Sequence, residues 1–206
     1  MSMLDDLITI YADVFVGDLA RYVIGAGGVF LMINVLLGRY LAARRLRPGP
    51  ARKREQYLWE FLASLRTVVI FAFTGTLIVL GARHGAFTIY GDFSEFGYVY
   101  FAFSLVFVIV AHDAWFYWTH RLLHVRRVYH RCHRLHHRSN RPTPITSYSF
   151  DVTEAVANAL FLPLILLILP VHGLTLFLFV SHMMLRNALG HCSVEVFPAR
   201  RDGRPL

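Results

Sequence analysis

Residues 112–141 read HDAWFYWTHRLLHVRRVYHRCHRLHHRSNR, and we expect the rest of the chain to hold this stretch in place. Seven of the chain's eleven histidines fall within 26 of these residues. The stretch contains two spaced histidine patterns, HxxxH and HxxHH, whose members are His120, His124, His133, His136 and His137. Residues four apart lie on one face of an α-helix, so both histidines of HxxxH can reach a single ion. The spacing therefore predicts a metal site.

Two residues that precede the HxxxH pattern are assigned to the same helical face. Asp113 and Tyr117 lie seven and three residues before His120. A carboxylate such as Asp113 can hydrogen-bond a ligand imidazole and fix its tautomer and orientation, so we expect Asp113 to support the site. The alternative interpretation is a solvated basic surface. Such a surface does not require histidines in helical phase directly after an apolar segment.

The composition indicates an integral membrane protein. The chain has 206 residues, of which 56% are hydrophobic, and a mean hydropathy of +0.47, values far from those of a soluble domain. Its net charge of +8 does not indicate a nucleic-acid partner, because 13 of the 21 Lys and Arg residues fall in two segments, 44–54 and 121–141, beside apolar runs of membrane length. We predict one membrane-embedded domain over residues 1–206, folded as an all-α helical bundle.

Several apolar runs are long enough to cross a bilayer core of about 30 Å. Three of them cover residues 22–41, 61–82 and 98–118. Residues 1–20 carry four acids and do not fit a cleavable signal peptide, so we expect an interfacial lead-in. The apolar stretch 155–189 is long for one helix and short for two, and Pro163 and Pro170 interrupt it. That length predicts a hairpin and about four spans in all.

The charges of the loops predict which side carries the metal site. The segments 44–54 and 121–141 are basic, whereas the loop between the second and third spans holds one arginine and two acids. The positive-inside rule therefore places the histidine cluster on the cytoplasmic side. Two cysteines, Cys132 and Cys192, are too few for a disulfide framework, and we expect neither to bind metal. His84 is isolated and is expected to be structural.

Imidazole ligands suit several first-row metal ions, iron and zinc among them. Such ions at the end of a helical bundle would lie where an acyl chain or a sterol can reach them from the bilayer. This location suggests lipid oxidation, since imidazole-bound iron can activate O₂. The residue pattern alone does not separate iron from zinc.

The residues resemble those of a known family, the fatty acid hydroxylase superfamily, which includes sterol desaturases and C4-methyl sterol oxidases. The resemblance rests on the segments DAWFYWTHRLLH (113–124), HRLHH (133–137), TPITSYSFDVTEA (143–155) and NALGHCSVEVFP (187–198). It implies a di-metal centre bound by His120, His124, His133, His136, His137 and His191. Glu154 and Asn187 fall in the shared segments and are expected to support the ligands. His112 and His130 fall outside the histidine patterns and are expected to be supporting or structural.

The resemblance also implies an activity, namely a membrane-bound non-haem di-iron oxygenase. Such an enzyme uses two irons, O₂ and external electrons to hydroxylate or desaturate a lipid or sterol-like substrate. The sequence shows no GxGxxG, CxxC or haem-attachment motif, so a separate electron donor is expected. The resemblance suggests a cytochrome b5-like protein, or a ferredoxin with its reductase. The arginines between 121 and 141 would either steer such a donor or anchor the loop to anionic headgroups.

One departure from the family pattern bears on activity. Family members carry a further HxxHH box beyond the segment 187–198, and the printed sequence reaches Leu206 without it. We therefore expect a C-terminally truncated chain with a half-formed centre. Three alternatives remain: a non-catalytic membrane protein that keeps the fold, a zinc hydrolase, and a haem electron-transfer protein. Haem would need histidines facing each other deep within the spans, and an HExxH zinc site would need a glutamate where Arg121 stands.

Overall fold

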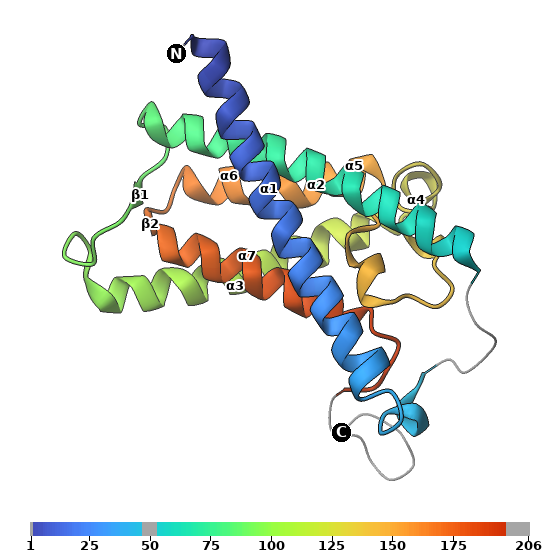
Figure 1. Cartoon of the computed structure of the whole chain (residues 1–206). Helices are drawn as coiled ribbons and strands as arrows, with labels where there is room; N and C mark the ends of the chain where they lie inside the picture. The colour runs from blue at the N-terminus through green and yellow to red at the C-terminus, as the bar shows by residue number, and fades with distance from the viewer. Residues whose placement is uncertain (1, 47–52, 197–206) are drawn as a thin grey trace.

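The computed structural model describes residues 2–46 and 53–196, and these form a helical bundle (Figure 1). The α-helices are α1 (Met3–Phe30), α2 (Arg54–Arg83), α3 (Gly97–Leu123), α4 (Arg126–Cys132), α5 (Val152–Ala159), α6 (Phe161–Leu166) and α7 (Gly173–Gly190). Short turns of helix join them: η1 (Leu31–Leu36), η2 (Ala42–Arg44), η3 (His136–Arg138) and η4 (Pro144–Tyr148). In this part of the chain, the strands β1 (Ile89–Tyr90) and β2 (Val171–His172) make the only sheet. The predicted all-α membrane fold is confirmed.

Three helices of the described residues are long and apolar enough to cross a membrane: Met3–Leu36, Arg54–Arg83 and Gly97–Leu123. The second and third contain the expected spans. The first begins at Met3 and not near residue 22, because Asp5 caps its first turn together with Ser2 and two further acids have charged partners. Asp18 forms an ion pair with Arg21, and Asp6 accepts a hydrogen bond from Arg83 of α2 at 2.8 Å. Residues 3–20 thus continue directly into the span, and an interfacial position for them stays a prediction.

The apolar stretch 155–189 forms the predicted hairpin. Helices α5 and α6 lead away from the histidine end, β2 lies at the tip, and α7 returns (Figure 1). Strand β2 pairs in parallel with β1, with Ile89 opposite Val171 and Tyr90 opposite His172. The outgoing arm breaks at Leu160, where Pro163 cannot donate a hydrogen bond to the preceding turn. Because β1 lies in the loop between α2 and α3, the hairpin reaches the opposite end of the bundle.

Helix α1 crosses over α2 and α7 and packs closely on both (Figure 1). Its buried side chains form one core with those of η1, α2, α7 and the residues after α7: Tyr22, Ala26, Val29, Ile33, Val68, Met184, Ala188, Cys192 and Val194. Two glycines set the close approach. A Cβ on Gly25 would lie 2.6 Å from Cγ of Met184, and a Cβ on Gly75 would lie 2.6 Å from Cγ1 of Val14. Any larger side chain at these positions would force the helices apart.

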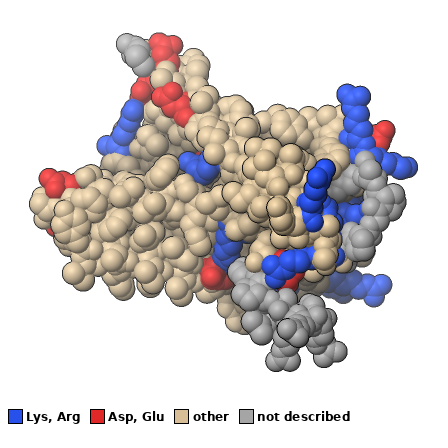
Figure 2. Space-filling model, turned by 60° about the horizontal axis from the view of Figure 1, so that its bottom comes forward, with Lys and Arg blue, Asp and Glu red and all other residues tan. Residues whose placement is uncertain are grey.

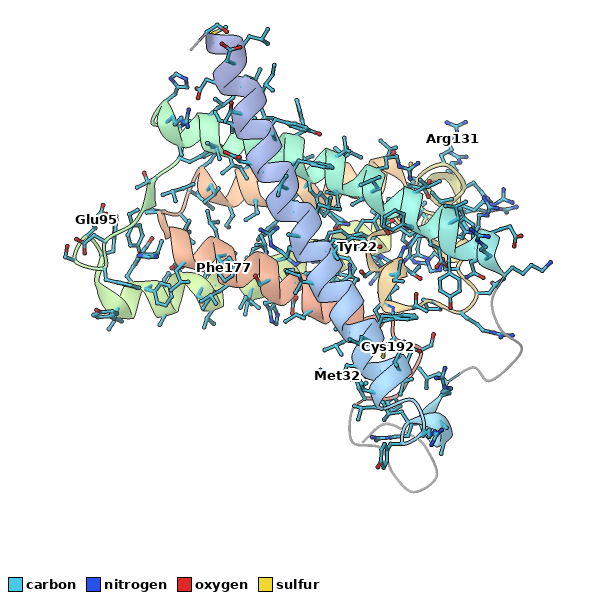
Figure 3. All side chains as sticks on the ribbon, in the orientation of Figure 1. Tyr22, Met32, Glu95, Arg131, Phe177 and Cys192 are labelled. Carbon is cyan, nitrogen blue, oxygen red and sulfur yellow. The ribbon has the colours of Figure 1, made fainter. Side chains whose placement is uncertain are left out.

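Charge is distributed unevenly along the bundle. Lys and Arg side chains are concentrated at the end that carries α4 and the histidine patterns (Figure 2). Arg131 lies at that end, and Glu95 lies at the opposite end in the loop between α2 and α3 (Figure 3). Residues 47–52 of the basic loop and residues 197–206, where a further histidine box was expected to be approached, lie outside the described residues. The described charges fit loops that alternate in sign across a membrane.

Candidate metal centre

The last turns of α3 carry the HxxxH pattern. His120 and His124 are one helical turn apart, and their Nε2 atoms lie 3.1 Å from each other. The helix ends directly after them, where the amide of His124 donates to the carbonyl of His120. Both imidazoles therefore project from one face at the end of α3, as the i and i+4 spacing predicted.

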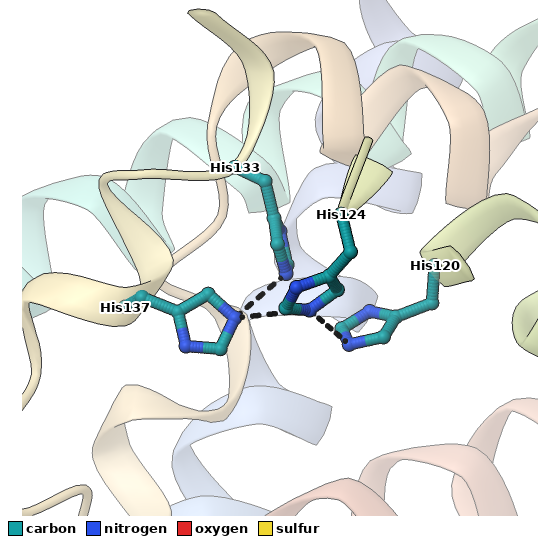
Figure 4. Close-up of side chains that lie close together, drawn as sticks. All are labelled: His120, His124, His133 and His137. Carbon is teal, nitrogen blue, oxygen red and sulfur yellow. Dashed lines mark hydrogen bonds between the residues drawn. The ribbon is translucent and has the colours of Figure 1, made fainter. Parts of the chain in front are cut away.

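Helix α4 turns the chain back so that the HxxHH pattern faces α3. His133 follows α4 directly and is fully buried. Nε2 of His137, on η3, lies 3.0 Å from Nε2 of His133 and 3.3 Å from Nε2 of His124. Figure 4 shows these rings, with His120, converging on one small volume. One ligand atom from each of the four histidines lies within 4.8 Å of all the others.

The spacing of these nitrogen atoms fits a bound metal ion. Imidazole nitrogens lie about 2.0–2.1 Å from a zinc ion, so neighbouring ligands at tetrahedral or right angles are about 2.9–3.4 Å apart. The contacts of 3.0, 3.1 and 3.3 Å fall within this interval. The four histidines thus offer a ligand set for one ion. Imidazole ligands suit several first-row metals, so the ligand set does not identify the metal.

A second imidazole pair lies beside the first group. Nε2 of His136 lies 3.2 Å from Nε2 of His191, which follows α7. Nδ1–H of His136 donates to the carbonyl of Ser149 at 3.2 Å, and Nδ1–H of His191 donates to the carbonyl of Asn187 at 2.8 Å. Carbonyl oxygens can only accept, so both neutral rings carry their proton on Nδ1. Two bare Nε2 lone pairs therefore face each other, and a cation between them would turn a repulsive contact into a binding site.

The histidines of both groups are held in their neutral, metal-binding form. Burial, together with the neighbouring His191 and His133, lowers the pKa of His136 to about 3. Burial also lowers the pKa of the other ligand candidates outside the spans, His124, His133, His137 and His191. These rings consequently present lone pairs at neutral pH, which metal binding requires.

Two of the predicted supporting residues contact the ligands. Oε2 of Glu154 lies 2.8 Å from Nδ1 of His133. Asn187 orients His191 through its carbonyl, while its own side-chain amide donates to the carbonyl of Ser147 at 2.7 Å. The sequence analysis missed Asp151, whose carboxylate accepts the amide of Leu135 at 2.9 Å beside the HxxHH pattern. Its signal was an acid three residues before Glu154 at the start of an apolar helix.

The turn η4 ends at Ser149, whose carbonyl orients His136, and a buried glutamate of α2 contacts this turn. Glu60 is fully buried and accepts a hydrogen bond from Thr146 at 3.1 Å. The carbonyl of Ile145 accepts from Tyr22 at 2.8 Å and from Ser64 at 3.1 Å. Sequence reasoning missed Glu60, although a carboxylate at the start of an apolar span indicates a residue with a buried polar contact.

Two predicted residues do not reach the imidazoles. The carboxylate of Asp113 pairs with Arg186 of α7, and the hydroxyl of Tyr117 accepts from Arg121 at 2.8 Å. Seven residues separate Asp113 from His120, or about 10 Å along a helix, so a shared face does not bring them into hydrogen-bonding distance. His130 is exposed, and its ring makes an edge-to-face contact with that of Tyr129. His112 lies further along α3, outside both imidazole groups.

A cavity of about 630 Å³ extends from the membrane-spanning part of the bundle to His191, one of the candidate ligands. Side chains from α1, α2, α3, α5, α6 and α7 line it, and most are apolar. His191 lines one part, and so does Phe116, whose ring stacks on His120 with 5.2 Å between centroids. The volume lies in the range of small-molecule pockets, and the lining suits an apolar molecule.

Comparison with known proteins finds relatives that cover much of this chain. The Delta(7)-sterol 5(6)-desaturase erg31 of Schizosaccharomyces pombe is 32% identical over 75% of this chain and 53% of its own length. A second Delta(7)-sterol 5(6)-desaturase, ERG3B of Gibberella zeae, is 27% identical over 66% of this chain and 42% of its own length. Lathosterol oxidase of Mus musculus is 24% identical over 72% of this chain and 50% of its own length.

The chain spans about half the length of these curated relatives. No solved structure was found to match it. Residues 105–204 match the family model described as fatty acid hydroxylase, and this segment contains both histidine patterns, Glu154 and His191. With the relatives and the helical bundle around a histidine cluster, this match assigns residues 105–204 of the chain to the fatty acid hydroxylase family.

Proposed function

We propose that residues 1–206 form a membrane-embedded domain of a non-haem di-iron oxygenase that hydroxylates or desaturates a lipid or sterol-like substrate. The facing Nε2 atoms of His136 and His191 carry the proposal. Their protons are committed to main-chain carbonyls, so the 3.2 Å contact needs a cation. One iron would be held by His120, His124, His133 and His137, and a second by His136 and His191.

When bound, iron would supply O₂ activation, and the residues of the chain would prepare its surroundings. Glu154 would fix the ring of His133, as carboxylates do for metal-bound imidazoles. The carbonyls of Ser149 and Asn187 would keep the lone pairs of His136 and His191 directed at the metal. The apolar lining of the cavity would exclude water from the reacting carbon.

The cavity supports a lipid as substrate. It extends from side chains of the spans to His191, so an apolar molecule bound in it would have one end close to the candidate metal ligands. The names of the relatives specify sterols, and a sterol-like or acyl body suits the mainly apolar lining. This comparison supports a lipid oxidoreductase.

Electrons would come from a separate protein, a cytochrome b5-like donor or a ferredoxin with its reductase. Exposed arginines surround the metal end and suit an acidic partner, with Arg126, Arg127 and Arg131 on α4. Other arginines at this end have structural contacts: Arg121 lies over the ring of Trp118 at 5.8 Å, and Arg138 over that of Trp59 at 5.3 Å. The excess of positive charge also favours the cytoplasmic side for the metal centre.

The test is the metal content of the purified protein, expressed with iron and zinc both supplied. We expect iron, and we expect the reduced protein to be reoxidised on exposure to air. Zinc without iron would favour the hydrolase alternative, because imidazole ligands suit both ions. Metal-free protein that takes up neither ion on addition would contradict the proposal and favour a non-catalytic member of the family.

A further inference from the structure

His112 is a polar residue in the cavity wall that the metal centre does not use. Its residue surface is 7% exposed, and its ring lies 4.9 Å from the ring of Phe161 and 5.4 Å from that of Phe179. Nδ1 is buried without a hydrogen-bond partner among the described residues. A polar ring in an apolar wall is costly, and because the protein encloses Nδ1, the other ring nitrogen is the one that a bound molecule can pair with.

The ring chemistry of His112 defines what it can bind. A neutral imidazole has one N–H donor and one acceptor nitrogen. Buried N–H groups without a partner are rarer than buried acceptors without one, so the enclosed Nδ1 is better occupied by a lone pair. The proton then lies on Nε2, the nitrogen that remains for a molecule in the cavity. His112 would therefore donate a hydrogen bond to an oxygen atom of the bound molecule.

The charges beside His112 favour a neutral molecule. Arg186 lines the cavity and pairs with Asp113, and Arg21 lines it and pairs with Asp18. Each guanidinium is thus balanced by a carboxylate from the same protein. A lipid carboxylate would bring a further negative charge into a low-dielectric space without an uncompensated cation to receive it. A hydroxyl or carbonyl oxygen carries no such penalty.

We propose that His112 binds the hydroxyl or carbonyl oxygen of a neutral lipid whose apolar body extends along the cavity toward His120 and His191. The inference rests on the proposed function, because it takes the cavity to be the substrate site. His112 and His120 are eight residues apart on α3, which corresponds to about 12 Å along the helix. The polar group of the substrate would therefore be bound about 12 Å along α3 from the first candidate metal ligand.

The experiment measures binding and needs no turnover. Metal-free protein in lipid nanodiscs is titrated with tritiated oleyl alcohol, and two competitors are compared: oleate and the matching hydrocarbon without oxygen. Because a buried hydrogen bond is lost, we expect the hydrocarbon to compete about tenfold less well than unlabelled alcohol. Oleate is expected to compete less well than the alcohol too. In His112→Phe the alcohol and the hydrocarbon should become equal, whereas His112→Gln, which keeps an N–H donor, should retain part of the preference.

Several outcomes would overturn this assignment. They are equal competition by alcohol and hydrocarbon in the natural protein, tightest binding of oleate, an unchanged preference in His112→Phe, and the absence of saturable binding. The unfolding midpoint of each variant without lipid checks that the fold is retained, and His112→Gln provides the comparison if His112→Phe does not fold. Iron content of the same preparations tests the proposed function separately. If the protein binds iron but does not prefer the alcohol to the hydrocarbon, the His112 inference is wrong and the proposed function still stands.

Discussion

Oε2 of Glu154 lies 2.8 Å from Nδ1 of His133, and neither side chain is more than 1% exposed. This buried contact ties the first turn of α5 to the imidazole group that faces α3. Replacement of Glu154 by alanine would leave Nδ1 of His133 without a hydrogen-bond partner in a space closed to water. The contact makes Glu154 a candidate for orienting His133 toward a bound metal.

We therefore predict that Glu154→Ala weakens iron binding by about 10- to 100-fold. Glu154→Gln keeps an acceptor oxygen and should lose less. Competition with a chromophoric chelator measures both affinities, and Glu95→Ala, in the loop at the other end of the bundle, is the control. An unchanged affinity in Glu154→Ala would show that the contact does not serve the metal.

The shifted histidines predict acid-sensitive stability of the metal-free protein. A histidine has a pKa of about 6.5 when unfolded, and burial lowers the pKa of His136 to about 3. The unfolded state thus binds more protons than the folded state. The contribution of His136 to the free energy of unfolding is therefore complete above pH about 6.5 and declines as pH falls toward 3. At pH 5 the loss from this one group is about 2 kcal/mol. Thermal unfolding in detergent at pH 7.5 and 5 should show a smaller difference for His136→Gln than for the natural chain; equal differences would contradict the prediction.

The charge distribution predicts that Arg131 lies on the cytoplasmic side and Glu95 opposite. In a background without the two natural cysteines, Glu95→Cys should react with an impermeant thiol reagent in intact cells. Arg131→Cys should react only after the cells are opened. Labelling of Arg131→Cys from outside would overturn this orientation, whereas the order of the helices would stand.

The exposed arginines of α4 are predicted to guide an electron donor. The double change Arg126→Glu with Arg127→Glu should slow reduction by an acidic donor, and the effect should shrink as salt rises. Reduction by a small uncharged reductant should stay the same. Glu95→Lys, a charge reversal in the loop at the opposite end of the bundle, is the control. If both electron sources slow equally, these arginines serve structure or membrane binding and not docking.

Much of the metal centre could be predicted from local spacing. His120 and His124 lie one helical turn apart, and a single helix end presents both. Pro163 and Pro170 interrupt an apolar run, which indicated the hairpin that brings His191 back. These inferences depend on helix periodicity and on the length of a membrane span, both of which are visible in the sequence.

The rest depends on contacts between distant segments. The carbonyls of Ser149 and Asn187, which orient His136 and His191, carry no side-chain signature, because every residue has a carbonyl. Glu60 supports η4 across 86 residues of sequence. Asp113 shares a helical face with His120 but is too far along the axis, and its partner Arg186 comes from α7. Sequence spacing indicates which residues share a helical face. Which side chains come close enough to contact each other, and with which partners, depends on how the helices pack.

The metal stoichiometry of single-histidine variants tests the central claim most directly. After anaerobic reconstitution and removal of loosely bound ions, elemental analysis should find two irons per natural chain. His136→Ala and His191→Ala should each retain one iron, held by the group of four, and His130→Ala should retain both. His124→Ala should weaken the other site. Full iron content in His136→Ala and His191→Ala, or a single iron in the natural chain, would contradict a two-metal centre built from these six histidines.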